Sequence, residues 1–144
     1  DDWHELCLEL RGIAPGDVVG LVAWIGRMSD LYVAHGYVSH LVVQLPVFEP
    51  KFEERLKTDR DGLIDILGSV GIGGFAIAAR TSADGPLSRE RARAHLLLVR
   101  LDHLCHDLSR GRIWQPADMA VQVRLVAEEL AEFLSMTPVP ARAE

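Results

Sequence analysis

Residues 95–110, HLLLVRLDHLCHDLSR, decide the fold class of this chain. Because an α-helix turns once in about 3.6 residues, apolar side chains three and four residues apart lie in one stripe along it. Pro86 and Ser88 before the stretch and Gly111 after it are typical of helix ends. The sequence therefore predicts a long amphipathic helix whose buried stripe is Ala94, Leu97, Leu98, Leu101, Leu104, Cys105 and Leu108.

A second stripe of the same kind follows after the short link GRIWQ, residues 111–115. Pro116 suits the first turn of a helix, and the prolines of TPVP, residues 137–140, end it. Because the link is short, we expect the two helices to form an antiparallel hairpin. The apolar positions of the second helix are Met119, Val123, Val126, Leu130, Phe133 and Leu134.

The first half of the chain also favours helices. We expect one over residues 1–12, closed by Gly12, and a second that begins after Asp17 as its N-cap and ends near Gly36. Residues 37–45 fit a helix, although the β-branched run before Pro46 leaves a strand open. KFEERLK, residues 51–57, is predicted as a short charged helix or the first turn of one, and DRDG, residues 59–62, as a break before LIDIL.

Length and composition predict that the chain folds as one unit. It has 144 residues, of which 49% are hydrophobic and 25% charged, unlike the apolar-poor composition of disordered chains. We therefore expect an all-α fold: a single compact multi-helix bundle over residues 1–144 that ends in the helical hairpin.

Charge and hydropathy narrow the classes of partner. A net charge of −6 and an isoelectric point near 5.5 argue against nucleic-acid binding. No apolar stretch is long enough to predict a membrane span, because Asp65 interrupts the nearest candidate. A mean hydropathy of +0.12 is high for a small domain, which favours a protein partner or homo-oligomer that covers apolar surface.

Cysteine usage bears on the cellular compartment of the protein, and arginine usage bears on its source. Cys7 and Cys105 each lie among apolar residues, which suits buried thiols in a reducing compartment better than a disulfide. The start, DDWHEL, shows no signal peptide, so we expect a cytoplasmic protein. Arg outnumbers Lys by 13 to 2, as in proteins of GC-rich bacterial genomes.

The long helix carries the one cluster of residues with metal-binding chemistry. His95, Asp102 and His106 share a stripe beside the leucines, and His103 lies near them. Imidazole and carboxylate four residues apart can bind one ion, with His35 or His40 as a ligand from another helix. HExxH, paired CxxC and ExxH patterns are absent, however. We therefore favour mild pairs on a solvated helix face, predict no cofactor, and keep a metal ion as the alternative. Cys105 is expected in the core.

The glycine-rich segment, residues 68–74, has two interpretations. GIGGFA, residues 71–76, matches the pattern of dinucleotide-binding turns, but that motif needs a preceding strand and the flanks here favour helices. We expect a tight bend or a close approach between helices instead. A small-molecule pocket between helices near this turn is a further hypothesis.

The absence of a catalytic signature favours a helical protein–protein interaction or regulatory module, self-associating as a homodimer, over an enzyme. A metal- or cofactor-binding protein, as an enzyme or not, is the alternative. The residues expected at the interface are Trp114, Met119, Val123 and Leu130.

Overall fold

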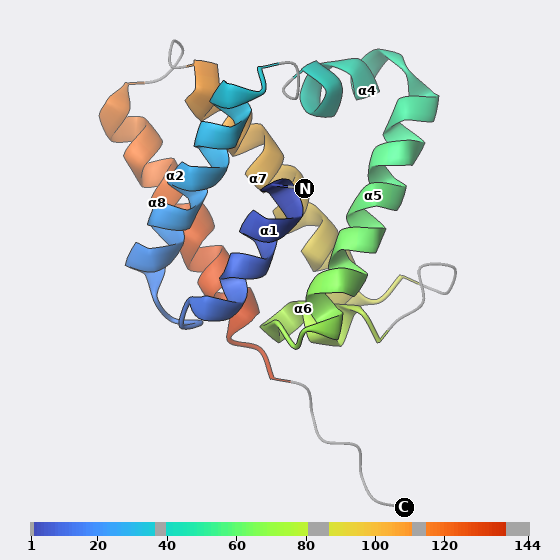
Figure 1. Ribbon diagram of the computed structural model, residues 1–144, viewed down its shortest axis with the longest axis vertical. Coiled ribbons are helices and arrows are strands. Elements are labelled where there is room, and N and C mark those ends of the chain that lie inside the picture. The colour runs from blue at the N-terminus through green and yellow to red at the C-terminus, as the bar shows by residue number, and fades with distance from the viewer. Residues whose placement is uncertain (1, 37–39, 81–86, 111–114, 138–144) are drawn as a thin grey trace, which may run out of the picture.

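The computed structural model describes residues 2–36, 40–80, 87–110 and 115–137 (Figure 1). Within those ranges the chain is helical without a strand, which confirms the all-α class. The elements in chain order are α1 (Asp2–Leu8), η1 (Glu9–Gly12), α2 (Val18–Ala34), η2 (His40–Gln44), α4 (Leu45–Phe48), α5 (Pro50–Ser69), α6 (Gly73–Ala78), α7 (Arg89–Arg110) and α8 (Pro116–Leu134).

Helix α7 is the central element, as the opening stretch predicts. It packs against α2, α5, α6 and α8, and its leucine stripe is buried. Arg93 of α7 pairs with Glu132 of α8 at 3.3 Å, and Arg100 pairs with Glu129. Residue numbers therefore rise along α7 as they fall along α8, so the two helices run antiparallel.

Specific hydrogen bonds fix the start of α2 and hold α1 against it. The Asp17 side chain accepts a hydrogen bond from the Gly20 amide at 2.9 Å, which confirms the predicted N-cap of α2. The indole of Trp24 donates to the carbonyl of Leu6 at 2.8 Å. Trp24 is buried, so this bond fixes α1 against the middle of α2. In Figure 1, α1 lies between α2 and α5 and contacts both.

The break predicted at residues 59–62 is wrong, because α5 continues from Pro50 to Ser69. Gly62 is exposed, and a helical glycine costs only about 1 kcal/mol relative to alanine. Two acidic residues close to Gly62 form ion pairs with α7. The guanidinium of Arg91, only 1% exposed, binds Asp61 and Asp65 of α5 at 3.2 and 3.0 Å. These interhelical ion pairs stabilise α5 where its own sequence indicates a turn.

Two shorter segments link these helices. Residues 40–44 form one wide helical turn that continues into α4, so the described part of residues 37–45 is helical rather than a strand. At the start of α6, Gly71 before the helix and Gly73 as its first residue adopt positive φ values of 78° and 38°. A methyl group at Gly73 would overlap the carbonyl of Leu134, so only glycine lets α6 approach the end of α8. The predicted bend and close approach are both confirmed.

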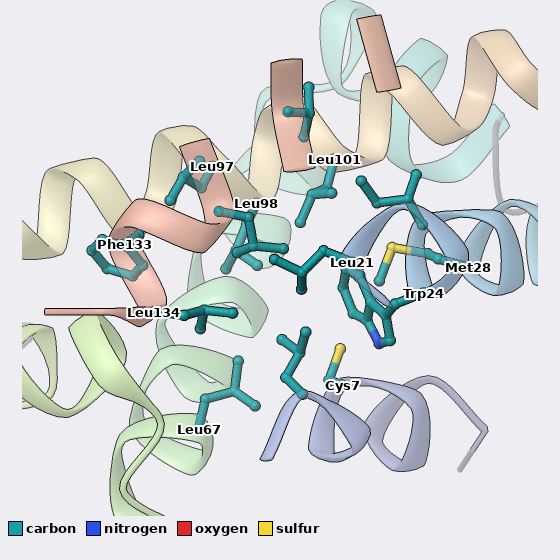
Figure 2. Close-up of a cluster of buried hydrophobic side chains, with 14 of the residues drawn as sticks. Cys7, Leu21, Trp24, Met28, Leu67, Leu97, Leu98, Leu101, Phe133 and Leu134 are labelled. Atoms are coloured by element: carbon teal, nitrogen blue, oxygen red, sulfur yellow. The ribbon is translucent and has the colours of Figure 1, made fainter. Parts of the chain in front are cut away.

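The core joins helices from both halves of the chain. Figure 2 shows Cys7 of α1, Trp24 of α2, Leu67 of α5, and Leu98 and Leu101 of α7 gathered around one centre. At the α6 end, the Phe75 and Phe133 rings meet edge to face with centroids 5.0 Å apart. A search of the described helices for a membrane-crossing segment finds none long and apolar enough.

Candidate functional site

An apolar cavity lies where α1, α2, α5 and α7 meet. Its volume is about 270 Å³. An enclosed protein cavity of ~150 Å³ holds a benzene molecule, so this one has room for roughly ten non-hydrogen ligand atoms. The glycine-rich turn supplies one end of the wall through Phe75 of α6. The lining side chains that matter below are Trp3, Cys7, Trp24, Met28, Leu63 and Leu101.

A small polar cluster interrupts this apolar wall. The Tyr32 hydroxyl of α2 donates to Asp102 Oδ1 of α7 at 2.7 Å. Arg60 Nη2 of α5 donates to Asp102 Oδ2 at 2.9 Å. All three side chains line the cavity. Burial raises the pKa of Tyr32, and the charge of Asp102 and its hydrogen bond raise it further. Tyr32 therefore stays a protonated donor.

The cluster has unused hydrogen-bond donors. A guanidinium carries five N–H donors, and Arg60 uses Nη2 for Asp102. The Nε atom of Arg60 is buried without a hydrogen-bond partner in the described residues. Both oxygens of Asp102, by contrast, already accept hydrogen bonds. Because a buried donor without a partner costs stability, an acceptor that reaches this guanidinium would be stabilising.

The cavity thiol is not a nucleophile. Burial raises the pKa of Cys7 to about 12, and the charge of Asp102 adds to the shift. A thiol with that pKa is protonated at neutral pH, whereas nucleophilic cysteines need thiolate character. Cys105 is fully buried with a raised pKa for the same reasons, which confirms its prediction as a core residue.

The histidine and aspartate residues of α7 lie in separate environments. His95 Nε2 lies 2.6 Å from Asp61 Oδ1, beside the Arg91 ion pairs. Asp102 pairs with Tyr32 and Arg60 rather than with His106, four residues away. Among the α7 histidines, His103 is the exposed one.

His106 is only 8% exposed, and its Nδ1 has no hydrogen-bond partner in the described part of the chain. Burial lowers its pKa. The expectation of a solvated face is therefore wrong for His95, Asp102 and His106. Helix α7 packs against several neighbours, so other helices cover the stripe beside its leucines.

The structure describes the two histidines proposed as ligands from a second helix to different extents. His35 follows α2, and its ring lies 6.5 Å from that of Trp3. The backbone of His40 lies in η2, while its side chain is outside the described part. Within the described ranges, no group of three or more His, Cys, Asp or Glu residues is placed to hold a metal ion.

The predicted interface residues differ in exposure. Met119 and Val123 are half-buried against the core, and Trp114 lies outside the described residues. Leu130 is fully buried and lines the cavity, so a partner protein could not reach it without opening the bundle. The exposed large apolar residues of α8 are instead Val121 and Leu125.

Sequence reasoning singled out Asp102, and Tyr32 fell inside the helix predicted after Asp17. It missed Arg60, which it placed in the break predicted at residues 59–62. Tyr32 and Arg60 are 70 and 42 residues from Asp102 along the chain, and no spacing rule pairs residues that far apart. The sequence carried no signal for this pairing, because Arg60 stands in the polar run KTDRDG, residues 57–62, with an aspartate on each side.

Comparison of the chain with protein-family models, with curated proteins and with solved structures gave no match. The cavity and its polar cluster are therefore the features from which a function is inferred.

Proposed function

We propose that this protein binds a small, largely apolar molecule in the cavity between α1, α2, α5 and α7, as a regulatory or carrier module. The observation that carries the proposal is the apolar cavity of about 270 Å³ with one polar cluster in its wall. Ligand sites in proteins combine mostly apolar walls with a few placed polar groups in this way.

Energetics support a ligand over a packing defect. Protein interiors pack as densely as organic crystals, and an enclosed cavity of this size costs several kcal/mol, at about 24 cal/mol per Å³. Water entry through the cavity mouth reduces that cost. A total stability of only about 5–15 kcal/mol is typical of a domain, so a ligand that fills the space would stabilise the fold measurably.

The groups around the cavity favour binding over catalysis. Cys7 and Tyr32 hold their protons, and the oxygens of Asp102 are occupied by two donors. A nucleophile next to a free base is the usual requirement for covalent catalysis. Cys7 and Tyr32, the lining groups that could act as nucleophiles, stay protonated, which supports a non-enzymatic role.

Isothermal titration with cumene, a purely apolar probe, tests the proposal. We expect saturable binding that weakens about tenfold or more in Leu63→Phe, because the larger side chain fills the cavity. Leu96→Phe is the matched control, since Leu96 is exposed on α7 and lies outside the cavity. Absence of saturable binding, or equal weakening in both variants, would contradict the proposal.

A second candidate function is self-association through the outer face of α8. Val121 and Leu125 are four residues apart on that helix, so they share one face, and their side chains are 59% and 54% exposed. Two large apolar side chains in one exposed patch are typical of an interface that another protein surface covers. The mean hydropathy of +0.12 supports the same proposal. The partner that we propose is a second copy of this chain.

Light scattering tests self-association directly. The parent chain should have the mass of a dimer at micromolar concentration, and Val121→Gln with Leu125→Gln should give a monomer of unchanged helix content. Val19→Gln is the control, because Val19 is exposed on α2. A monomeric parent chain would rule out this candidate.

Two features support the remaining expectations about where and with what the protein acts. Free, buried Cys7 and Cys105 support a reducing, cytoplasmic compartment. A net charge of −6 supports a ligand or protein partner rather than nucleic acid. The excess of Arg over Lys supports a bacterial source.

A further inference from the structure

We infer that the ligand of this cavity is an uncharged molecule with one hydrogen-bond acceptor, such as a ketone, and that the Arg60 guanidinium binds that acceptor. This inference rests on the proposed function and names the ligand class for the same site. It follows from the charge of the cavity wall and from which polar atoms there are still unused.

The charge of the wall disfavours an anionic ligand. Apart from His4, its charged side chains in the described residues are Arg60, Asp59 and Asp102. Arg60 and Asp102 form a salt bridge at 2.9 Å with side chains only 18% and 25% exposed, so they neutralise one another. Asp59 leaves the wall with net negative charge. Asp59 is exposed, but a carboxylate ligand would lose its own hydration in a partly buried site beside that like charge, which is costly.

The hydrogen-bonding capacity of the wall favours an acceptor on the ligand. Asp102 already accepts from Tyr32 and Arg60, and the Tyr32 hydroxyl already donates to Asp102. The unused capacity is at the end of the Arg60 guanidinium, where Nη2 donates to Asp102 and Nη1 makes no hydrogen bond within the described residues. A carbonyl oxygen on the ligand would therefore gain a charge-assisted hydrogen bond. A donor group would compete for oxygens that are already occupied.

A cationic ligand is the competing ligand class. The edge-to-face pair of Trp3 and Tyr32, with ring centroids 5.2 Å apart, and the carboxylate of Asp59 are features that attract ammonium ions. The guanidinium of Arg60 opposes this, because it is a fixed positive charge in the same wall. We therefore expect a neutral ligand to bind more tightly than a cation of the same shape.

Four probes of matched size and shape separate these classes: cumene, acetophenone, benzoate and the ammonium ion of branched phenylethylamine. Titration calorimetry on the full chain should rank acetophenone tightest, about tenfold or more above cumene, since a hydrogen bond to a charged group adds that much affinity. Benzoate and the ammonium ion should bind more weakly than acetophenone.

Two variants assign the selectivity to the polar cluster. Arg60→Met should remove the advantage of acetophenone over cumene while cumene still binds. Arg55→Met is its control, because Arg55 is exposed on α5 and outside the cavity. Asp102→Asn keeps a side chain of the same shape but leaves the charge of Arg60 unbalanced. It should strengthen benzoate binding about tenfold or more, and this holds even if Arg60→Met fails to fold.

The outcomes distinguish the two proposals. If none of the four probes binds, the proposed function fails and the ligand class fails with it. If cumene binds as tightly as acetophenone, or if benzoate or the ammonium ion binds most tightly, the cavity is a binding site but the inferred ligand class is wrong. A benzoate affinity unchanged by Asp102→Asn would also overturn the role of the wall charge.

Discussion

At the scale of single residues, Asp102 shows what a helical spacing can and cannot indicate. Periodicity places Asp102 on the correct stripe of α7, but the sequence predicts a mild contact with His106, four residues away. In the structure its oxygens bind Tyr32 and Arg60 from two other helices. Local spacing identifies neighbours on one helix, whereas the partners of a half-buried carboxylate come from whichever helices pack there. Those contacts depend on the tertiary fold.

His106 gives a prediction at the same scale. Burial lowers its pKa below the ordinary 6.5, so the folded state takes up a proton at this ring less readily than the unfolded state. The stability that comes from the neutral ring is present above about pH 6.5 and is lost as the pH falls through the folded-state pKa. His106→Leu should therefore flatten the fall in unfolding free energy between about pH 7 and pH 5.

Urea denaturation at a series of pH values measures this effect. Leu96→Gln is the control, because Leu96 is exposed on the same helix and carries no titratable group, so the slope of the parent protein should be unchanged. Parallel curves for the parent and His106→Leu would contradict the assignment of the slope to the buried imidazole.

At the scale of elements, helices with a regular amphipathic pattern were predicted most accurately from the sequence. The apolar stripes of α7 and α8 predicted both helices close to their observed ends, Arg89–Arg110 and Pro116–Leu134. Helix α5 was predicted in two pieces because Asp59–Gly62 has the composition of a turn. Asp61 and Asp65 of α5 instead pair with the buried Arg91 of α7. A local composition rule cannot detect stabilisation that comes from a neighbouring helix.

The glycines of α6 and α5 allow a matched test of close packing. Gly73→Ala should destabilise the chain by about 2 kcal/mol or more, because Gly73 has positive φ and its added methyl meets the backbone of Leu134. Gly62→Ala should be neutral or stabilise by up to about 1 kcal/mol, because its Cβ would meet open space in a helix interior. Thermal and urea unfolding compare the two, and equal effects would contradict the close approach of α6 to α8.

At the scale of the whole molecule, the cavity is a property of packing that no single element carries. Its lining comes from eight helical elements, α1, η1, α2, η2, α5, α6, α7 and α8. The sequence supported the hypothesis of a pocket near the glycine-rich turn, and the described cavity reaches Phe75 beside that turn. The sequence could not supply its volume or its polar cluster, because both depend on how residues far apart in the chain meet.

The central claim, that this cavity holds a small apolar ligand, is tested most directly by nuclear Overhauser contacts between bound acetophenone and the protein. We predict contacts from the aromatic ring of the ligand to Trp24, Met28 and Leu63, and their loss in Leu63→Phe. Contacts confined to exposed residues such as Val121 and Leu125, or no contacts at saturating acetophenone, would contradict it.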